Sequence, residues 1–339
     1  MQAMRLIKPA PVEDFPLISN DVNLPLPDSR QLLLRVLTCG VCHTDLHIAE
    51  GELTAPGLPL TLGHQVVAEI ESVGEALTGF SVGQRVGVPW MHTTCGQCEF
   101  CRRGEENLCE LARFTGLHVD GGFAEFMLAD PQFVLPLPAT MSDLQAAPLL
   151  CAGIIGYRAL RQADLHPGER LGLFGFGASA HLAIQLARHW DCEVYVFTRS
   201  AQHRRHAESL GAAWTGSAED SPSKLLDRAV SFAPIGELVP LALEKLRRGG
   251  TLAINSVHST PIPQLPYALI YGERTLRSVT NATRQDGLEF LDLAAEIPLI
   301  ASVTEYPLED SNEALLDVKN ASVNGQAVLR VAQSLSKLY

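Results

Sequence analysis

The stretch that decides the fold is Arg170-Leu-Gly-Leu-Phe174-Gly175-Phe176-Gly177-Ala178-Ser179-Ala180. A short apolar strand over 170–174 runs into two glycines, and a helical pattern of apolar residues follows over 178–189. The glycines read G-x-G-x-x-A, a turn in which backbone N–H groups can approach a pyrophosphate at a helix N-terminus. We therefore expect the turn to bind a dinucleotide through Gly175, Gly177, Ala178 and Ser179. A tight strand–helix turn without a ligand is the alternative.

The residues that follow continue an alternation of strands and helices. A second apolar run covers 193–197, and Ser200 can cap a helix over 201–210 that ends at Gly211. Strand, helix and strand patterns then follow at 229–232, 238–246 and 250–256. Such alternation is typical of a parallel sheet with right-handed crossovers. We expect residues 151–285 to form a doubly wound α/β domain of the Rossmann type.

The first 150 residues have a different pattern. Short runs of strand-forming residues, such as 31–37, 66–73 and 85–88, alternate with glycines and prolines. The chain has 339 residues, which suggests two domains. From about Asp286 the strand–helix rhythm is lost. We expect residues 1–150 to form a small β-rich domain, completed by residues 286–339.

Composition and charge exclude several classes of protein. Hydrophobic residues make up 46% of the chain, enough for globular cores, and the formal net charge is −12. An acidic chain without a basic run is a poor ligand for nucleic acid or for an anionic membrane. The sequence contains no run of 18 apolar residues and no signal-peptide pattern at its start. We expect a cytoplasmic protein whose partners include neither nucleic acid nor a membrane.

Four of the eight cysteines lie close together. Cys95, Cys98, Cys101 and Cys109 have the spacing C-x2-C-x2-C-x7-C, which can surround one tetrahedral Zn²⁺. The loop has no core pattern, so a metal would have to order it. Free thiols and an iron–sulfur cluster are the alternatives, although the ferredoxin pattern has three residues before its fourth cysteine. We expect a structural zinc, with all four ligands from the protein.

A second set of polar residues is scattered along the chain. The stretch 42–47 reads Cys-His-Thr-Asp-Leu-His, the triplet 63–65 reads Gly-His-Gln, and Cys151 stands where the two patterns meet. A single cysteine or histidine usually has a plain structural role. Spacing alone does not unite these three places.

In order along the chain, residues 40–47, Gly63-His64, the four-cysteine loop, residues 120–125 and Gly175-Phe-Gly177 are similar to the zinc-containing medium-chain alcohol dehydrogenases, in their bacterial and yeast-like branch. The resemblance covers nearly the whole chain and implies a GroES-like catalytic domain beside the Rossmann domain. It implies Cys42, His64 and Cys151 as ligands of a catalytic zinc with an open fourth position. Asp45 resembles the carboxylate that orients the zinc histidine. Thr44 and His47 resemble the family's proton relay.

Further roles are implied by the same resemblance. His43 and Arg330 resemble contacts to the cofactor pyrophosphate, and Leu53 and Trp90 resemble walls of the substrate pocket. Position 65 departs from the family pattern, because Gln65 stands where a glutamate is usual. Two zinc ions per subunit and a homodimer or homotetramer are expected.

The cofactor preference depends on the end of the second strand. Thr198 stands where an acidic residue would bind the ribose hydroxyls of NAD. Without that charge a 2′-phosphate is not repelled, and Arg199 and Arg204 can attract it. We expect NAD(P), with NADP slightly favoured over NAD. If both arginines face solvent, NAD remains adequate.

These observations predict an enzyme that transfers hydride reversibly between a small to medium primary or secondary alcohol and a nicotinamide cofactor, the carbonyl product being an aldehyde or ketone. A polyol or formaldehyde dehydrogenase of the same superfamily is one alternative. A non-catalytic dinucleotide-binding protein is the other, and Gln65 is the one residue that favours it.

Overall fold

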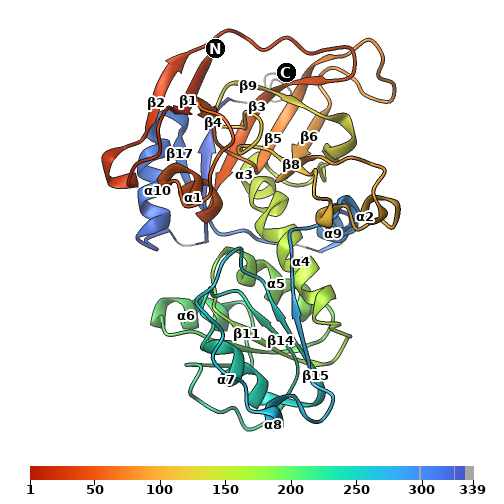
Figure 1. Ribbon diagram of the computed structural model, residues 1–339, viewed down its shortest axis with the longest axis vertical. Helices are drawn as coiled ribbons and strands as arrows, with labels where there is room; N and C mark the ends of the chain where they lie inside the picture. Colours follow the sequence, from red (N-terminus) through yellow and green to blue (C-terminus); the bar gives the residue numbers. More distant parts are fainter. Residues whose placement is uncertain (298, 324, 333–339) are drawn as a thin grey trace. The chain divides into compact units, whose positions relative to one another are not determined.

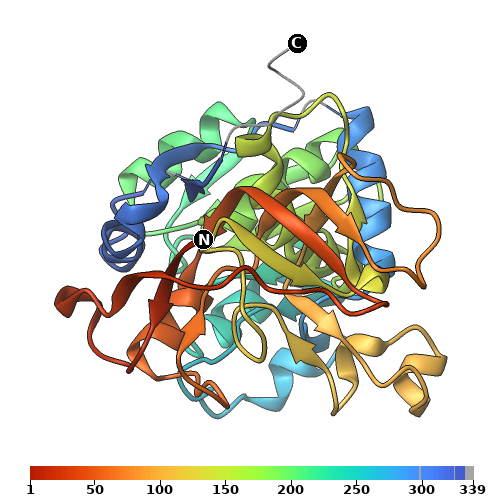
Figure 2. The same cartoon turned by 90° about the horizontal axis from the view of Figure 1, so that it is seen from above.

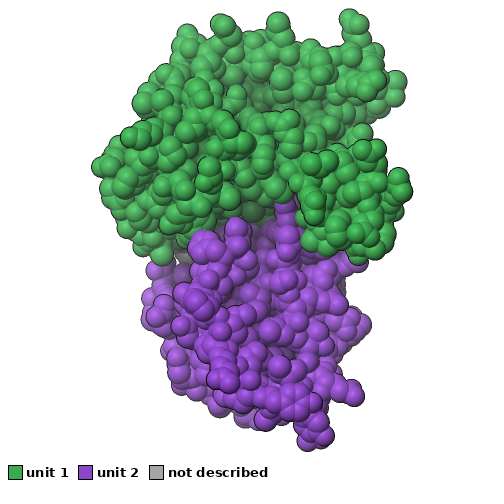
Figure 3. Space-filling model, in the orientation of Figure 1, with its two compact units in different colours: residues 1–151, 283–339 green, residues 152–282 purple. Residues whose placement is uncertain are grey.

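The computed structural model describes residues 1–297, 299–323 and 325–332. The chain divides into two compact units, one of residues 1–151 and 283–339 and one of residues 152–282 (Figure 3). The sequence analysis sets these boundaries at 150/151 and 285/286 instead. The assignment of a zinc-binding role to unit 1 and a dinucleotide-binding role to unit 2 stays a prediction.

Unit 2 is built on a parallel sheet of six strands in the order β13-β12-β11-β14-β15-β16 (Figure 1). The strands are β11 (Arg170–Phe174), β12 (Glu193–Phe197), β13 (Trp214–Gly216), β14 (Leu226–Ser231), β15 (Leu246–Ile254) and β16 (Thr275–Ser278). This order reverses beside β11, as in the doubly wound dinucleotide-binding fold. The predicted Rossmann-type sheet is confirmed.

Five helices connect or precede these strands. They are α4 (Ala152–Gln162), α5 (Ala178–His189), α6 (Ala201–Ser209), α7 (Leu238–Lys245) and α8 (Tyr267–Ile270). Helix α5 turns Leu182 and Leu186, both fully buried, toward the core of the unit. It packs against α4 where Gly156 has no side chain, since a Cβ there would lie 3.0 Å from the carbonyl oxygen of Ser179. This packing fixes the direction of α5, whose first turn follows the glycine-rich stretch.

Unit 1 is rich in strands. Its largest sheet has the order β10-β6-β5-β3-β18-β17, with β9 paired to β3. The members are β10 (Leu135–Pro136), β6 (Arg85–Val88), β5 (Val66–Val73), β3 (Leu32–Val41), β18 (Gln326–Arg330), β17 (Val303–Pro307) and β9 (Phe126–Ala129). A three-stranded sheet joins β2 (Leu17–Asp21), β1 (Gln2–Leu6) and β4 (Leu60–Thr61), and a two-stranded one joins β7 (Met91–Thr93) and β8 (Arg113–Phe114). The predicted β-rich domain is thereby confirmed.

Residues 303–330 add two strands and an α-helix to unit 1. Strand β18 pairs antiparallel with β3, with Ala327 opposite Val41. Helix α10 (Ser311–Lys319), part of the blue C-terminal segment in Figure 2, packs against α1 (His43–Glu50) and the short helix η1 (Val12–Asp14). Lys319 forms ion pairs with Glu13 and Glu50 across this contact.

The remaining helices of unit 1 are short apart from α9. They are α2 (Glu99–Arg102), η2 (Glu106–Leu108), η3 (Pro131–Phe133), α3 (Asp143–Ala146), η4 (Ala147–Leu150), α9 (Arg284–Glu296) and η5 (Leu308–Asp310). Within the described part of the chain, none of the helices is long and apolar enough to cross a membrane.

Candidate active site

Three residues far apart in the sequence meet in unit 1. Cys42 follows β3 and caps α1, its sulfur accepting a hydrogen bond from the backbone N–H of Thr44 at 3.3 Å. His64 lies between β4 and β5, and Cys151 directly follows η4. The three ligand atoms lie within 4.8 Å of one another, and Cys42 Sγ is 3.4 Å from His64 Nε2. The fold thus brings together residues that spacing alone left separate.

The donor set fits a zinc ion. Tetrahedral zinc with ordinary bond lengths places a sulfur and a nitrogen ligand about 3.5 Å apart, close to the observed distance. A hydrogen bond from the Cys151 thiol is the main cause that holds the pKa of Cys42 well below its ordinary value. Burial lowers the pKa of His64, but the nearby charges of Asp45 and Cys42 outweigh it and raise that pKa to about 10. The surroundings of His64 therefore favour a positive charge at this point.

Asp45 ties two of the three segments together. Its side chain is fully buried, and Oδ1 accepts hydrogen bonds from His64 Nδ1 at 3.0 Å and from the backbone N–H of Gly63 at 3.1 Å. Oδ2 accepts the backbone N–H of Cys42 at 3.0 Å. The carboxylate therefore fixes the His64 ring with Nε2 directed at Cys42. An isolated buried carboxylate would be unfavourable, and these three donors offset part of that cost, although burial still raises the pKa of Asp45.

The first turns of α1 carry three further predicted residues. Thr44 and His47 are three positions apart and therefore lie on the same face of the helix. His47 Nδ1 bonds to Glu52 Oε2 at 2.6 Å, so this carboxylate orients the imidazole ring. His43 is exposed at the start of the helix, with its ring centroid 6.3 Å from that of His47.

An aromatic layer lies beside the candidate metal ligands. Trp90 meets the His64 ring edge to face at 4.8 Å between centroids. Phe114 stacks on Trp90 at 5.0 Å, with 10° between the ring planes. Leu53, Trp90 and Phe114 are all partly buried against the same core. Phe114 could not be expected from the sequence, because its stack on Trp90 depends on the pairing of β7 with β8, for which the sequence contains no local pattern.

Gln65 is fully buried directly after His64. Neither its amide nitrogen nor its amide oxygen has a hydrogen-bond partner among the described residues. Its side chain covers Gly40 so closely that a Cβ at position 40 would lie 2.9 Å from Gln65 Cδ. A buried amide without partners costs about 1–3 kcal/mol per unsatisfied group, so this position is chemically unusual within the core.

The four-cysteine loop forms a second compact donor set. The four sulfurs of Cys95, Cys98, Cys101 and Cys109 lie within 4.8 Å of one another. Cys95 Sγ is 3.9 Å from Cys101 Sγ, close to the distance of about 3.8 Å that tetrahedral zinc imposes on two thiolates. Backbone N–H groups, first of Gln97 and then of Cys98, lower the pKa of Cys95 to about 6. Four converging sulfurs with backbone donors fit a closed zinc site.

The predicted dinucleotide turn lies at the end of β11 in unit 2. Gly175 has a φ of +87°, and a Cβ there would lie 3.1 Å from the backbone nitrogen of Ala233. Gly177 caps α5, and a Cβ there would meet nothing within 4 Å. Ala178 and Ser179 form the first turn, where backbone N–H groups have no partner within the helix. The turn thus combines a glycine-only conformation with open space in front of a helix N-terminus.

Thr198 and Ser200, which follow β12, are fixed by hydrogen bonds from the backbone and from side chains. The backbone N–H of Thr198 donates to Gly216 at 2.8 Å, and Arg204 Nε donates to the Thr198 carbonyl at 2.8 Å. Ser200 caps α6 by accepting from the backbone N–H of His203. Arg199 is exposed. Arg204 is therefore directed back at the strand end and does not simply extend into solvent.

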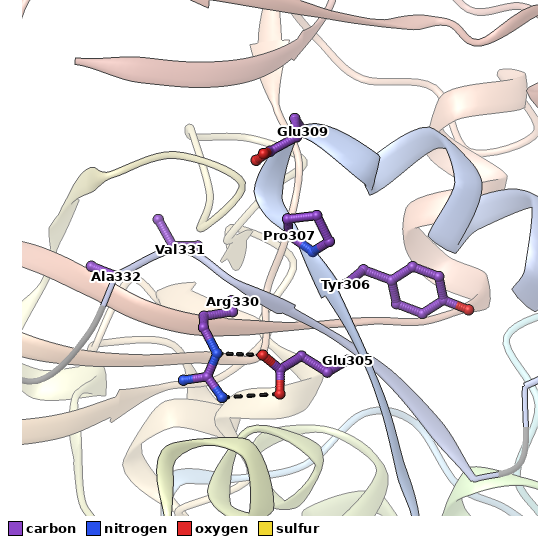
Figure 4. A pocket seen from close by; sticks show the side chains of 7 residues that line it. All are labelled: Glu305, Tyr306, Pro307, Glu309, Arg330, Val331 and Ala332. Carbon is purple, nitrogen blue, oxygen red and sulfur yellow. Dashed lines mark hydrogen bonds and ion pairs between the residues drawn. The ribbon is translucent and has the colours of Figure 1, made fainter.

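Arg330 lies on β18 in unit 1, beside a pocket that Glu305, Tyr306, Pro307, Glu309, Val331 and Ala332 also line. Its guanidinium forms two hydrogen bonds to the Glu305 carboxylate, one of them at 2.9 Å (Figure 4). This ion pair raises the pKa of Arg330 and lowers that of Glu305. The expected contact of Arg330 with a pyrophosphate stays a prediction.

Comparison with known families agrees with the two units. Residues 28–139 match the profile of the alcohol dehydrogenase GroES-like domain, and residues 180–296 match that of the zinc-binding dehydrogenases. Among solved structures, a cinnamyl alcohol dehydrogenase of Sorghum bicolor has a TM-score of 0.89 at 27% identity and covers 98% of both chains. The alcohol dehydrogenase of Aeropyrum pernix has a TM-score of 0.85 at 30% identity, covering 98% of this chain and all of its own.

Sequence relatives extend over the whole chain. A probable alcohol dehydrogenase of Mycobacterium tuberculosis is 45% identical over 98% of this chain and 97% of its own. An alcohol dehydrogenase of Geobacillus stearothermophilus is 32% identical over 96% of this chain and all of its own. With both domain profiles and these relatives in agreement, the chain belongs to the zinc-containing medium-chain alcohol dehydrogenase family and is an oxidoreductase that acts on alcohols.

Proposed function

We propose that the enzyme holds two zinc ions per subunit and oxidises small to medium uncharged alcohols with NADP⁺ in preference to NAD⁺. The observation that carries this proposal is the convergence of Cys42, His64 and Cys151, with Asp45 directing the His64 ring. Three protein ligands leave one tetrahedral position for a water or an alcohol, as in catalytic zinc sites. The four-cysteine set has no such position and would be structural.

When bound, zinc would lower the pKa of an alcohol and polarise a carbonyl, and a nicotinamide would exchange hydride. The chain's own residues would handle the proton. Thr44 and His47 share one face of α1, which supports a proton path that leads from the Thr44 hydroxyl toward the imidazole. Glu52 bonds to His47 Nδ1 and would orient the imidazole for proton exchange.

The substrate wall is apolar and aromatic. Trp90, stacked on Phe114 and edge-on to His64, supplies a flat surface beside the candidate zinc ligands. Such a surface favours the hydrocarbon part of an uncharged alcohol and offers few partners to the hydroxyl groups of a polyol. Phe114→Ala should raise KM for bulky alcohols more than for ethanol.

The cofactor preference rests on the end of β12. Thr198 brings no carboxylate, the exposed Arg199 is free to reach a phosphate, and Arg204 is anchored on the Thr198 carbonyl. Ser200 and the N-terminus of α6 add favourable dipoles for an anion. Arg199→Ala should reduce kcat/KM for NADP⁺ selectively.

A homodimer is supported by the edge of the unit 2 sheet. Strand β16 stands at the end of the sheet order, and all four of its residues are exposed. Exposed Tyr267 and Tyr271 of the neighbouring segment add apolar area. An open strand edge is a template for pairing with a second chain. A homotetramer and a cytoplasmic location stay predictions.

The test is metal analysis of the purified enzyme together with oxidation of a panel of alcohols by NAD⁺ and NADP⁺, before and after chelation. Two zinc ions per chain, activity that chelation removes and zinc restores, and a higher kcat/KM with NADP⁺ would support the proposal. One metal per chain, iron in place of zinc, or activity that survives complete metal removal would contradict it.

A further inference from the structure

The corner of unit 2 where β12 and β13 end contains a carboxylate that the sequence pattern did not reveal. Gly216, the last residue of β13, accepts the backbone N–H of Thr198. The chain then turns, and Asp220 Oδ2 accepts the backbone N–H of Ser217 at 2.7 Å and its hydroxyl at 2.9 Å. The same oxygen lies 3.0 Å from the place of a Cβ on Gly216. The exposed Asp220 carboxylate therefore lies next to Gly216, the residue of β13 to which the Thr198 backbone is hydrogen-bonded.

Two cations act on this carboxylate from different elements. Arg204 comes from α6 and is held on the Thr198 carbonyl, while Lys245 ends α7 with its ammonium 5.8 Å from the centroid of the Phe197 ring. The two donors of Ser217 are the main causes that lower the pKa of Asp220, and the charges of Arg204 and Lys245 add to them. Lys245 is only 6% exposed, so its field is poorly screened by water.

We propose that Asp220 is a specificity-determining residue for the cofactor, supplying from the next strand the negative charge that position 198 lacks. The negative charge of Asp220 partly neutralises the positive charges of Arg204 and Lys245. A 2′-phosphate that approaches these two cations is therefore attracted less strongly than it would be without Asp220. The same carboxylate favours a cofactor with a free ribose hydroxyl. This inference rests on the proposed cofactor site, and it predicts that a preference of this chain for NADP(H) is moderate.

The simpler role for Asp220 is to hold the turn through Ser217. Asn is the substitution that separates the two roles. Its amide oxygen can still accept the Ser217 hydrogen bonds, while the charge is lost. Glu219 supplies the matched control: it carries the same charge on the neighbouring exposed residue and acts on Lys245 at least as strongly as Asp220 does, so it tests whether the place of Asp220 beside Gly216 and its effect on Arg204, and not its effect on Lys245, set the preference.

The experiment compares the Kd values of NADPH and NADH for wild type, Asp220→Asn and Glu219→Gln, measured by fluorescence titration of the zinc-loaded enzymes. For Asp220→Asn we expect tighter NADPH binding by about three- to tenfold, the effect of removing one partly screened charge close to the phosphate. NADH binding should be unchanged or weaker, the Tm unchanged, and the NADPH effect smaller at high salt. Glu219→Gln should change the ratio of the two Kd values less than twofold. An unchanged ratio in Asp220→Asn, or an equal change in Glu219→Gln, would overturn the proposal.

Different measurements test the preference for NADP(H) and the role of Asp220. The wild-type ratio of the Kd values tests the preference for NADP(H), whereas the change of that ratio in Asp220→Asn tests Asp220. A wild type that prefers NADH, with a variant shifted toward NADPH, would refute the first proposal and support the second. A wild type that prefers NADPH, with a variant of unchanged ratio, would leave Asp220 as a turn residue only.

Discussion

Replacing His181 by leucine should make unit 2 less sensitive to acid. His181 is the fourth residue of α5, is 1% exposed, and has no hydrogen-bond partner for either ring nitrogen among the described residues. Its ring centroid is 5.8 Å from that of His206. Burial, and then the charge of His206, lower its pKa to about 4. The folded protein therefore keeps this imidazole neutral at a pH where the unfolded chain protonates it.

The sign and size follow from proton linkage. An unfolded histidine has a pKa of about 6.5, so below that pH the unfolded chain binds a proton that the folded unit does not. The free energy of unfolding should fall by about 2 kcal/mol at pH 5 relative to pH 7.5, and by about 3 kcal/mol once the pH is below both pKa values. This contribution is fully present above pH 6.5 and is lost progressively as the pH falls toward 4.

The assay is urea unfolding of wild type and His181→Leu at pH 7.5 and pH 5.0, with amide hydrogen exchange of α5 as a local probe. Wild type should lose about 2 kcal/mol more than the variant between the two pH values. His189→Gln, which replaces an exposed histidine at the end of the same helix, should behave like wild type. Equal losses in wild type and His181→Leu would refute the reasoning, because the buried imidazole would then not be the group that titrates.

Four further predictions concern unit 1. Cys101→Ser should remove one zinc and lower the urea midpoint, whereas Cys42→Ser should abolish turnover with a milder effect on unfolding; equal effects on unfolding would count against two distinct sites. Gln65→Glu should keep the metal content but raise the apparent pKa of the pH–rate profile for alcohol oxidation, since a carboxylate near the metal reduces its effective charge; an unaltered profile would show position 65 to be electrostatically silent. Gly40→Ala should destabilise the enzyme by about 1–3 kcal/mol through overpacking, measured by Tm and relieved by adding Gln65→Ala; a neutral effect would contradict the close contact. His47→Ala should slow turnover mainly at low pH and respond to added imidazole, and a variant indifferent to imidazole would remove His47 from the proton path.

Elements with a local signal could be predicted from the sequence. The strands at 170–174 and 193–197 and the helix at 178–189 have the expected bounds, because their apolar periodicity is uninterrupted. Strand β14 begins at Leu226, before the expected start at 229, since Asp227 and Arg228 look like loop residues. In the fold they are nearly buried, with Asp227 bound by Arg170 at 2.9 Å and Arg228 by Glu169 at 3.1 Å. Charges that are paired across strands carry no local signature.

The same distinction applies to the candidate site. Motifs with fixed local spacing, such as the glycine turn and the four cysteines, were visible in the sequence, and the three scattered ligands needed a family resemblance. Neither a motif of fixed local spacing nor the family resemblance pointed to Phe114 or Asp220. Phe114 reaches Trp90 through strand pairing, and Asp220 reaches the end of β12 through the adjacent strand. Contacts made across a sheet depend on register, which single-sequence reasoning did not supply.

Because β3 pairs with β18, the main sheet of unit 1 cannot be completed until late in the synthesis of the chain. Unit 2 is one continuous segment, so all of its residues emerge from the ribosome together. In unit 1, by contrast, Val41 cannot form its strand pair until Ala327 has been synthesised. At about 5–20 residues per second, synthesis of the intervening chain takes about 15–60 seconds. Throughout that time the edge of β3 that precedes Cys42 has no strand to cover it. In the nascent chain this strand edge beside Cys42 therefore stays exposed until β18 is made, and a translational stall before that point prolongs the exposure to aggregation.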